Sequence, residues 1–113
     1  MHEMALSQGI IDVIRDQAET QGFRSVKSVR LAIGMLSHVE PEAIEFCFEA
    51  VSRGTLAEGA VLTIERPPGQ AFCMPCGQTV AIAQRYDPCP LCGGHEWVLT
   101  GGDELRVKEL EVE

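Results

Sequence analysis

Two short stretches, Cys73-Met-Pro-Cys76-Gly77 and Cys89-Pro-Leu-Cys92-Gly93, decide how the middle of this chain folds. In each stretch two residues separate the cysteines, so that one tight turn directs both thiolates toward the same point. The glycine after each pair tolerates a positive φ, which lets backbone N–H groups turn toward the sulfurs. Four thiolates around one ion form a closed tetrahedral site, which is typical of structural zinc.

Two other interpretations of the cysteine pairs stay open. A thioredoxin-like redox pair needs a single C-x-x-C at the start of a helix, whereas proline and glycine flank both pairs here. A rubredoxin-like iron site has similar chemistry, because tetrahedral sulfur also suits iron. We predict a zinc site formed by Cys73, Cys76, Cys89 and Cys92, and the sequence alone leaves iron open.

The segment around the pairs, residues 69–102, contains too little apolar material for an independent core. We therefore expect the metal to hold it together. A boundary falls at Pro67-Pro68-Gly69, and short strand-like pieces lie at 79–83 and 97–100. Because the chain beyond Gly102 has the regular patterns of the first half, we predict two domains, 1–68 plus 103–113 and an inserted zinc-binding domain at 69–102.

Hydrophobic periodicity predicts the elements of the larger domain. Apolar residues at helical spacing indicate helices over 5–21 and 41–54, and period-two alternation indicates strands at 25–34 and 60–65. A final strand follows Gly101-Gly102, with a register break before its end. The predicted fold class is α+β, with two helices on a small three-stranded sheet and an inserted zinc-ribbon-like domain.

Length and charge exclude several classes of protein. The 113 residues suit one compact domain with a small appendage, and nine basic against seventeen acidic side chains give a net charge of −8. This balance argues against binding nucleic acid, which needs clustered Lys and Arg. The sequence has no apolar run of the ~20 residues needed to span a bilayer and no signal peptide, so we expect a cytoplasmic protein. A four-cysteine site has no open position for hydrolysis, so we expect no catalytic residues.

The fifth cysteine and the three histidines lie outside the knuckles. Cys47 occupies an apolar position beside Phe48, which indicates core packing rather than a reactive thiol. We expect His38 to be a solvated loop residue. His95 follows the complete cysteine set and is free to bind another metal.

The amino terminus is chemically able to bind a metal ion. His2 can bind a metal ion through its imidazole and its own backbone nitrogen, which closes a six-membered chelate ring. The terminal amine or the backbone nitrogen of Glu3 would supply a further ligand in the same plane. Deprotonated backbone nitrogens favour square-planar Ni(II) or Cu(II). Position alone, however, favours a solvent-exposed terminal side chain without a role.

These features together resemble the HypA/HybF hydrogenase maturation nickel chaperones. The resemblance rests on Met1-His2-Glu3 before a helix, the two C-x2-C-G knuckles, an acidic residue at Glu40, and the closing 107–113 strand, and it covers the whole chain. It implies that His2 is the principal nickel ligand, with Glu3 and His95 as further nickel-site residues. It also implies that the four cysteines bind zinc, whereas Glu40 matches only some relatives.

The resemblance implies a nickel metallochaperone that delivers Ni(II) for maturation of a [NiFe] hydrogenase. The expected partners are a HypB-type GTPase, the hydrogenase large subunit and, as in some relatives, urease maturation proteins. A weak homodimer is compatible with the sequence. The alternative is a zinc-ribbon protein-interaction module without nickel transfer.

Overall fold

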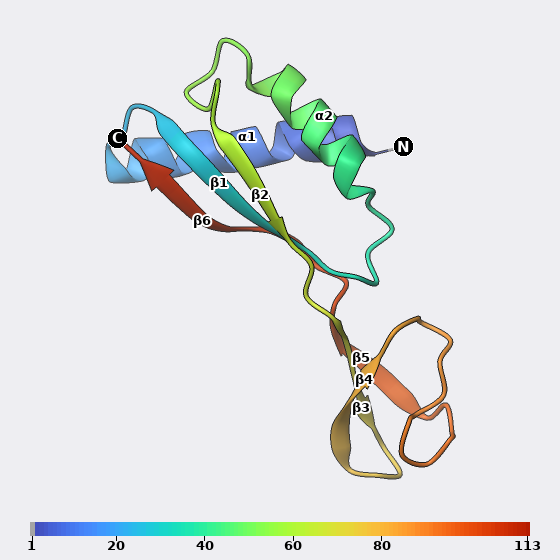
Figure 1. Cartoon of the computed structure of the whole chain (residues 1–113). Coiled ribbons are helices and arrows are strands. Elements are labelled where there is room, and N and C mark those ends of the chain that lie inside the picture. Colours follow the sequence, from blue (N-terminus) through green and yellow to red (C-terminus); the bar gives the residue numbers. More distant parts are fainter. Residues whose placement is uncertain (1) are drawn as a thin grey trace. The chain divides into compact units, whose positions relative to one another are not determined.

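The computed structural model describes residues 2–113. Figure 1 shows two helices and two separate groups of strands. By their contacts the residues form a first unit of Met1–Leu31, Val39–Ile64 and Arg106–Glu113, and a second unit of Ala32–His38 and Glu65–Leu105. The fold is α+β, as the sequence predicts.

The first unit contains both helices, α1 (Glu3–Gln21) and α2 (Pro41–Ser52). Helix α1 ends where Gly22 adopts φ 80° and its N–H donates to the carbonyl of Ala18 at 2.7 Å. Pro41 begins α2, where its missing N–H costs nothing. Both helices match the predicted ones, although α1 begins two residues earlier than expected.

The first sheet has the strand order β2-β1-β6, with β1 at Val26–Ile33, β2 at Val61–Glu65 and β6 at Leu105–Val112. Strands β1 and β2 lie side by side and run in the same direction, and α2 connects them along the chain (Figure 1). Strand β6 runs antiparallel to β1, because Glu113 N donates to Ser25 O and Gly34 N donates to Glu104 O.

The core of the first unit is mainly apolar. Its largest fully buried side chains come from α1, β1 and α2 and are Ile11, Ile14, Val29, Leu31 and Ile44, and Ser7 of α1 is also fully buried. The predicted core residue Cys47 is only half-buried, because Ile44 and Phe48 occupy the centre of the inward face of α2.

The second unit is a three-stranded antiparallel sheet in the order β4-β3-β5. Strand β3 (Gly69–Cys73) lies between β4 (Gln78–Ile82) and β5 (Trp97–Gly101), with Cys73 opposite both Gln78 and Trp97. The sequence predicts β4 and β5 but not β3.

The second unit contains the predicted inserted segment 69–102 and extends beyond it to include Ala32–His38. The reason is Leu36, which is buried in a cluster with Ala71, Val80 and Ile82. Its N–H also donates to Gly102 O at 2.7 Å, while Met35 N donates to Pro67 O at 2.8 Å. The loop after β1 is therefore part of the hydrophobic support of the metal-binding segment.

No helix in the described part of the chain has the length and apolar character needed to cross a membrane.

Candidate metal centre

The two predicted knuckles have the same backbone geometry. Gly77 N donates to Cys73 O and Gly93 N donates to Cys89 O, each at 2.8 Å. The two glycines adopt φ 65° and 76°, which residues with a side chain rarely do. Each C-x-x-C-G stretch is thus one closed turn that presents two sulfurs on the same side.

The four cysteine sulfurs converge on one point. Every Sγ lies within 4.8 Å of the others, and this is the only group of three or more potential metal ligands among residues 2–113. The Cys73–Cys92 and Cys76–Cys89 sulfur pairs are 3.7 and 3.9 Å apart. A regular tetrahedron with Zn–S bonds of about 2.3 Å has an edge of about 3.8 Å, so the donor set fits a zinc ion.

Hydrogen bonding differentiates the thiols within this cluster. Hydrogen bonds with the Cys73 and Cys92 thiols, together with burial, raise the pKa of Cys76 to about 12. By contrast, backbone N–H groups of Cys92 and Leu91 lower the pKa of Cys89 to about 7. The Leu91 N–H lies 3.4 Å from Cys89 Sγ and stabilises the thiolate that a metal needs.

The loop before the second knuckle is held by a residue that sequence reasoning missed. The Asp87 carboxylate accepts hydrogen bonds from the N–H groups of Ala83 and Gln84, both at 3.0 Å. The backbone carbonyl of Asp87 accepts a hydrogen bond from the indole N–H of Trp97 at 2.9 Å. The Asp87-Pro88 dipeptide, a common turn signal, is the feature of the sequence that points to this role.

His95 is exposed and lies beside the knuckles of the second unit. The residues on either side of it are fixed to both pairs: Gly94 O accepts from Cys89 N at 2.7 Å, and Glu96 O accepts from Met74 N at 2.9 Å. His38 is also exposed and belongs to the second unit.

His2 and Glu3 belong to the first unit, at the start of α1. His2 is exposed and occupies the N-cap position, but its side chain makes no capping hydrogen bond. The Glu3 carboxylate accepts a hydrogen bond from Glu40 N at 3.4 Å. The structure therefore brings together Glu3 and Glu40, two of the predicted acidic residues. The terminal amine invoked as a ligand lies outside the described residues.

Comparison with known proteins adds the family context. Residues 1–112 match the family described as "Hydrogenase/urease nickel incorporation, metallochaperone, hypA". The chain is 57% identical to the hydrogenase maturation factor HypA of Rhodopseudomonas palustris (strain BisA53) over 113 residues, with both proteins covered completely. The HypA of Azotobacter chroococcum mcd 1 is also 57% identical over the same length.

A solved structure has the same fold. The solution structure of the Ni metallochaperone HypA from Helicobacter pylori superposes with a TM-score of 0.76, covering 99% of this chain and 97% of that one. The sequence identity to it is 24%, so this likeness supports the fold rather than the chemistry.

Proposed function

Because this chain belongs to the HypA family of hydrogenase and urease nickel-incorporation metallochaperones, we propose that it binds Ni(II) as cargo at its amino end. It then delivers the ion to the maturing large subunit of a [NiFe] hydrogenase. The observation that carries this proposal is His2, an exposed imidazole at the start of α1 with no capping hydrogen bond of its own. The protein acts without catalysis, in the cytoplasm.

The start of α1 offers suitable nitrogen ligands. Leu6 N donates to His2 O at 2.8 Å, so the helix uses the carbonyl of His2 and leaves the backbone nitrogens of the first turn without an acceptor inside the helix. Nickel in a planar arrangement takes such nitrogens together with an imidazole. His2 and the backbone at Glu3 are therefore the central ligands of the proposed site.

The Glu3 carboxylate extends the same site, and its contact with Glu40 N joins the starts of α1 and α2. His95 remains a prediction as a further nickel ligand. A site at a chain terminus also suits transfer, because its ligands can be exchanged one at a time for those of an acceptor. A rigid buried cage would release the ion slowly.

We assign a structural role to the four-cysteine site. Cys73, Cys76, Cys89 and Cys92 are the residues that would hold Zn(II), which would supply cross-links that a small apolar cluster lacks. The four cysteine sulfurs would fill all four coordination positions of a tetrahedral ion, so a bound ion would keep no open position for a reacting water.

The proposed partners are a HypB-type GTPase, the hydrogenase large subunit and urease maturation proteins. A hydrogenase assay in cells that lack their own copy of this protein tests delivery. Wild type and His38→Ala, which alters an exposed histidine of the second unit, should restore activity, whereas His2→Ala should not. Equal restoration by His2→Ala would favour the alternative, a zinc-ribbon interaction module without nickel transfer.

A further inference from the structure

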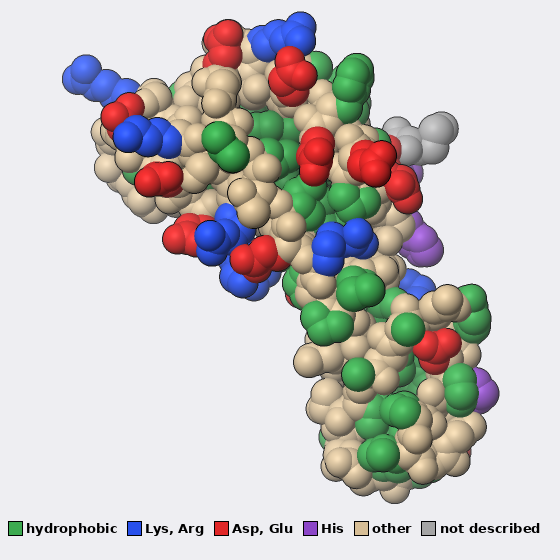
Figure 2. All heavy atoms as spheres, in the orientation of Figure 1, with side chains coloured by type: hydrophobic (Ala, Val, Ile, Leu, Met, Phe, Trp, Pro, Cys, Tyr) green, Lys and Arg blue, Asp and Glu red, His purple; other side chains and the backbone are tan. Residues whose placement is uncertain are grey.

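The outer face of α2 combines acidic side chains with an exposed aromatic ring. Phe46, in the middle of the helix, is 73% exposed, whereas Phe48 is buried in the core. With 3.6 residues per turn, an arc of about 100° around the helix axis holds Phe46 and three exposed glutamates, Glu42, Glu45 and Glu49. We call these four residues the acidic face of α2. In Figure 2, acidic side chains follow the position that α2 has in Figure 1.

Folding alone does not account for the acidic face of α2. Glu42 suits the first turn, because an acidic side chain is favourable near a helix N-terminus. Glu45 and Glu49, however, lie one turn apart and repel each other. Of the three glutamates only Glu49 has a cationic partner in the described part of the chain, Arg53 at 2.9 Å. The Phe46 ring gains nothing from burial, and side chains that work against local stability are expected at functional surfaces.

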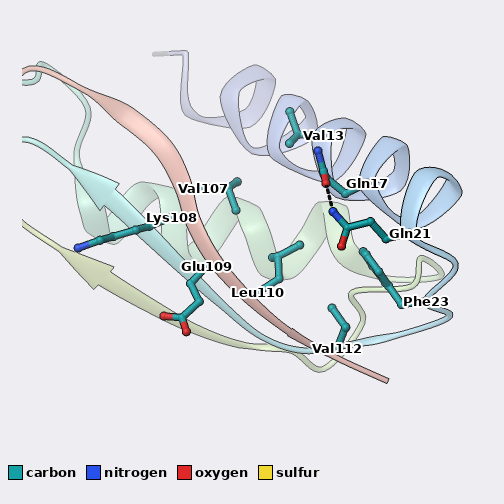
Figure 3. Close-up of a pocket in the computed structure, with 9 residues that line it drawn as sticks. All are labelled: Val13, Gln17, Gln21, Phe23, Val107, Lys108, Glu109, Leu110 and Val112. Carbon is teal, nitrogen blue, oxygen red and sulfur yellow. Dashed lines mark hydrogen bonds between the residues drawn. The ribbon is translucent and has the colours of Figure 1, made fainter.

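A second exposed apolar surface of the first unit lacks this charge pattern. A groove of about 300 Å³ lies between α1 and β6, and Val13 on its α1 side is 47% exposed. Figure 3 shows Gln17 and Gln21 in this groove, hydrogen-bonded to each other at 2.7 Å. Its charged lining residues are one lysine and one glutamate. The groove therefore favours neither sign of charge, whereas the acidic face of α2 favours a cationic surface.

We propose that the acidic face of α2 docks a partner protein that presents arginine and lysine side chains around an apolar pocket. Phe46 would fill the pocket, and the surrounding cations would pair with the three carboxylates, as at interfaces where a charged rim encloses an aromatic anchor. An arginine of the partner can also stack on the phenylalanine ring. Binding would then offset the repulsion between Glu45 and Glu49 that the unbound chain retains.

The position of this face suits the delivery of nickel, and this part of the inference rests on the proposed function. Glu40 directly precedes α2, and its N–H donates to the Glu3 carboxylate at 3.4 Å. The start of α2 therefore adjoins the proposed nickel ligands, and a partner seated on α2 would be held beside them. The acidic face shares no residue with the proposed nickel site, so each can be altered without the other.

A defined peptide tests the chemistry of the acidic face. The probe is a fluorescein-labelled amphipathic helical peptide with leucines on one side, flanked by arginines, and its binding to the full-length chain is measured by fluorescence anisotropy at low salt. Phe46→Ala and Glu45→Lys should each weaken binding about tenfold. The matched changes on α1, Val13→Ala and Glu19→Lys, alter exposed residues outside the face and should leave binding within about twofold of wild type.

Thermal unfolding separates docking from a structural role. Glu45→Lys should unfold at the same temperature as wild type or a higher one, because a lysine at this position attracts Glu49 instead of repelling it. Phe46→Ala removes a ring that is mostly in solvent and should shift the unfolding temperature by only a few degrees. Weaker peptide binding by chains of undiminished stability is the combination expected of a docking surface.

Hydrogenase activity in cells that lack their own copy of this protein tests the same face in delivery. Phe46→Ala and Glu45→Lys should lower the activity about tenfold, whereas the purified variants should hold as much nickel and zinc as wild type. The peptide titration needs no metal, so it decides on the docking face even if the wild-type chain holds no nickel and the proposed function fails.

Three results would overturn the docking proposal. The first is a peptide that binds wild type, Phe46→Ala and Glu45→Lys equally well. The second is full hydrogenase activity with both variants. The third is loss of nickel from either variant, because the acidic face would then belong to the metal site and not to a separate surface.

Discussion

The Cys76 and Cys89 sulfurs lie 3.9 Å apart and yet hold their protons very differently. Neighbouring thiols and burial raise the pKa of Cys76 to about 12, while backbone N–H groups lower that of Cys89 to about 7. Near neutral pH the metal-free cluster therefore combines a thiolate-forming residue with one that keeps its proton. A metal ion binds four thiolates only after the remaining protons leave.

Metal affinity at the knuckles should therefore depend on pH. Bound cysteines are deprotonated, and Cys76 is protonated in the metal-free chain at neutral pH, so protons compete with the metal. We expect zinc affinity to fall at least tenfold when the pH is lowered from about 7 to about 6, as measured by competition with a chelator of known affinity. An affinity that does not change over this range would show that the thiols are already ionised without metal.

The positions of single residues could be predicted from the sequence where they depend on residues close by in the chain. The four cysteines converge as their spacing indicates, because each C-x-x-C-G stretch closes its own turn. The contact between Glu3 and Glu40 joins residues 37 positions apart, and the sequence contains no periodicity that links them. The sequence predicts a more buried position for Cys47 than the structure shows, because helical spacing identifies the buried face of a helix but not which residues lie at the centre of that face.

At the scale of elements, the connections within the second unit depend on close backbone approach. Gly34 follows β1 and packs directly on the backbone of Gly102, so a Cβ at position 34 would overlap the Gly102 carbonyl group. Gly9, inside α1, has no atom within 4 Å of an added Cβ. Close backbone packing therefore requires a glycine at position 34 but not at position 9.

Alanine substitutions at these two glycines should have opposite effects on stability. Gly34→Ala should lower the free energy of unfolding by about 2 kcal/mol, because the overlap forces the backbone apart. Gly9→Ala should raise it by about 0.5–1 kcal/mol, because alanine is the better helix former. Urea unfolding of both variants measures these changes, and a Gly34→Ala protein as stable as wild type would contradict the close packing.

Most helices and strands were predictable, and the exceptions have physical causes. Amphipathic periods marked α1 and α2, and alternation marked β1, β2 and β6. Strand β3 was missed because it begins directly after Pro67-Pro68 and ends on Cys73, which belongs to a knuckle. The contribution of residues 32–38 to the second unit was also missed, since a loop has no period that reports where Leu36 is buried.

At the scale of the whole molecule, the two units differ in what holds them together. The first unit has a core of large aliphatic side chains such as Ile11, Ile14 and Leu31. The buried cluster of the second unit is smaller and includes Cys73 and Cys89 themselves. Metal binding should therefore matter to the folding of the second unit far more than to the first.

Removing the metal should unfold one unit selectively. Trp97 is the single tryptophan and lies in the second unit, where its indole is bonded to Asp87 O. With excess chelator we expect its fluorescence to shift to the red while the far-ultraviolet helical signal of α1 and α2 remains, and added Zn(II) should reverse the shift. Simultaneous loss of both signals would contradict independent stabilisation of the units.

Surface charge suits the proposed cargo at this scale. Acidic side chains outnumber basic ones by seventeen to nine, and Figure 2 shows both signs interspersed over the visible face of the first unit. Such a surface attracts cations rather than phosphates. The excess of acid was visible in the sequence, whereas the finding that the His2 side chain makes no capping hydrogen bond required the structure.

The most direct test of the nickel-carrier proposal is the nickel and zinc content of the untagged chain after loading with Ni(II) and removal of unbound metal. Wild type and His38→Ala should each retain one nickel and one zinc per chain, and His2→Ala should retain the zinc and lose the nickel. A His2→Ala protein that holds as much nickel as wild type would contradict the amino-terminal site.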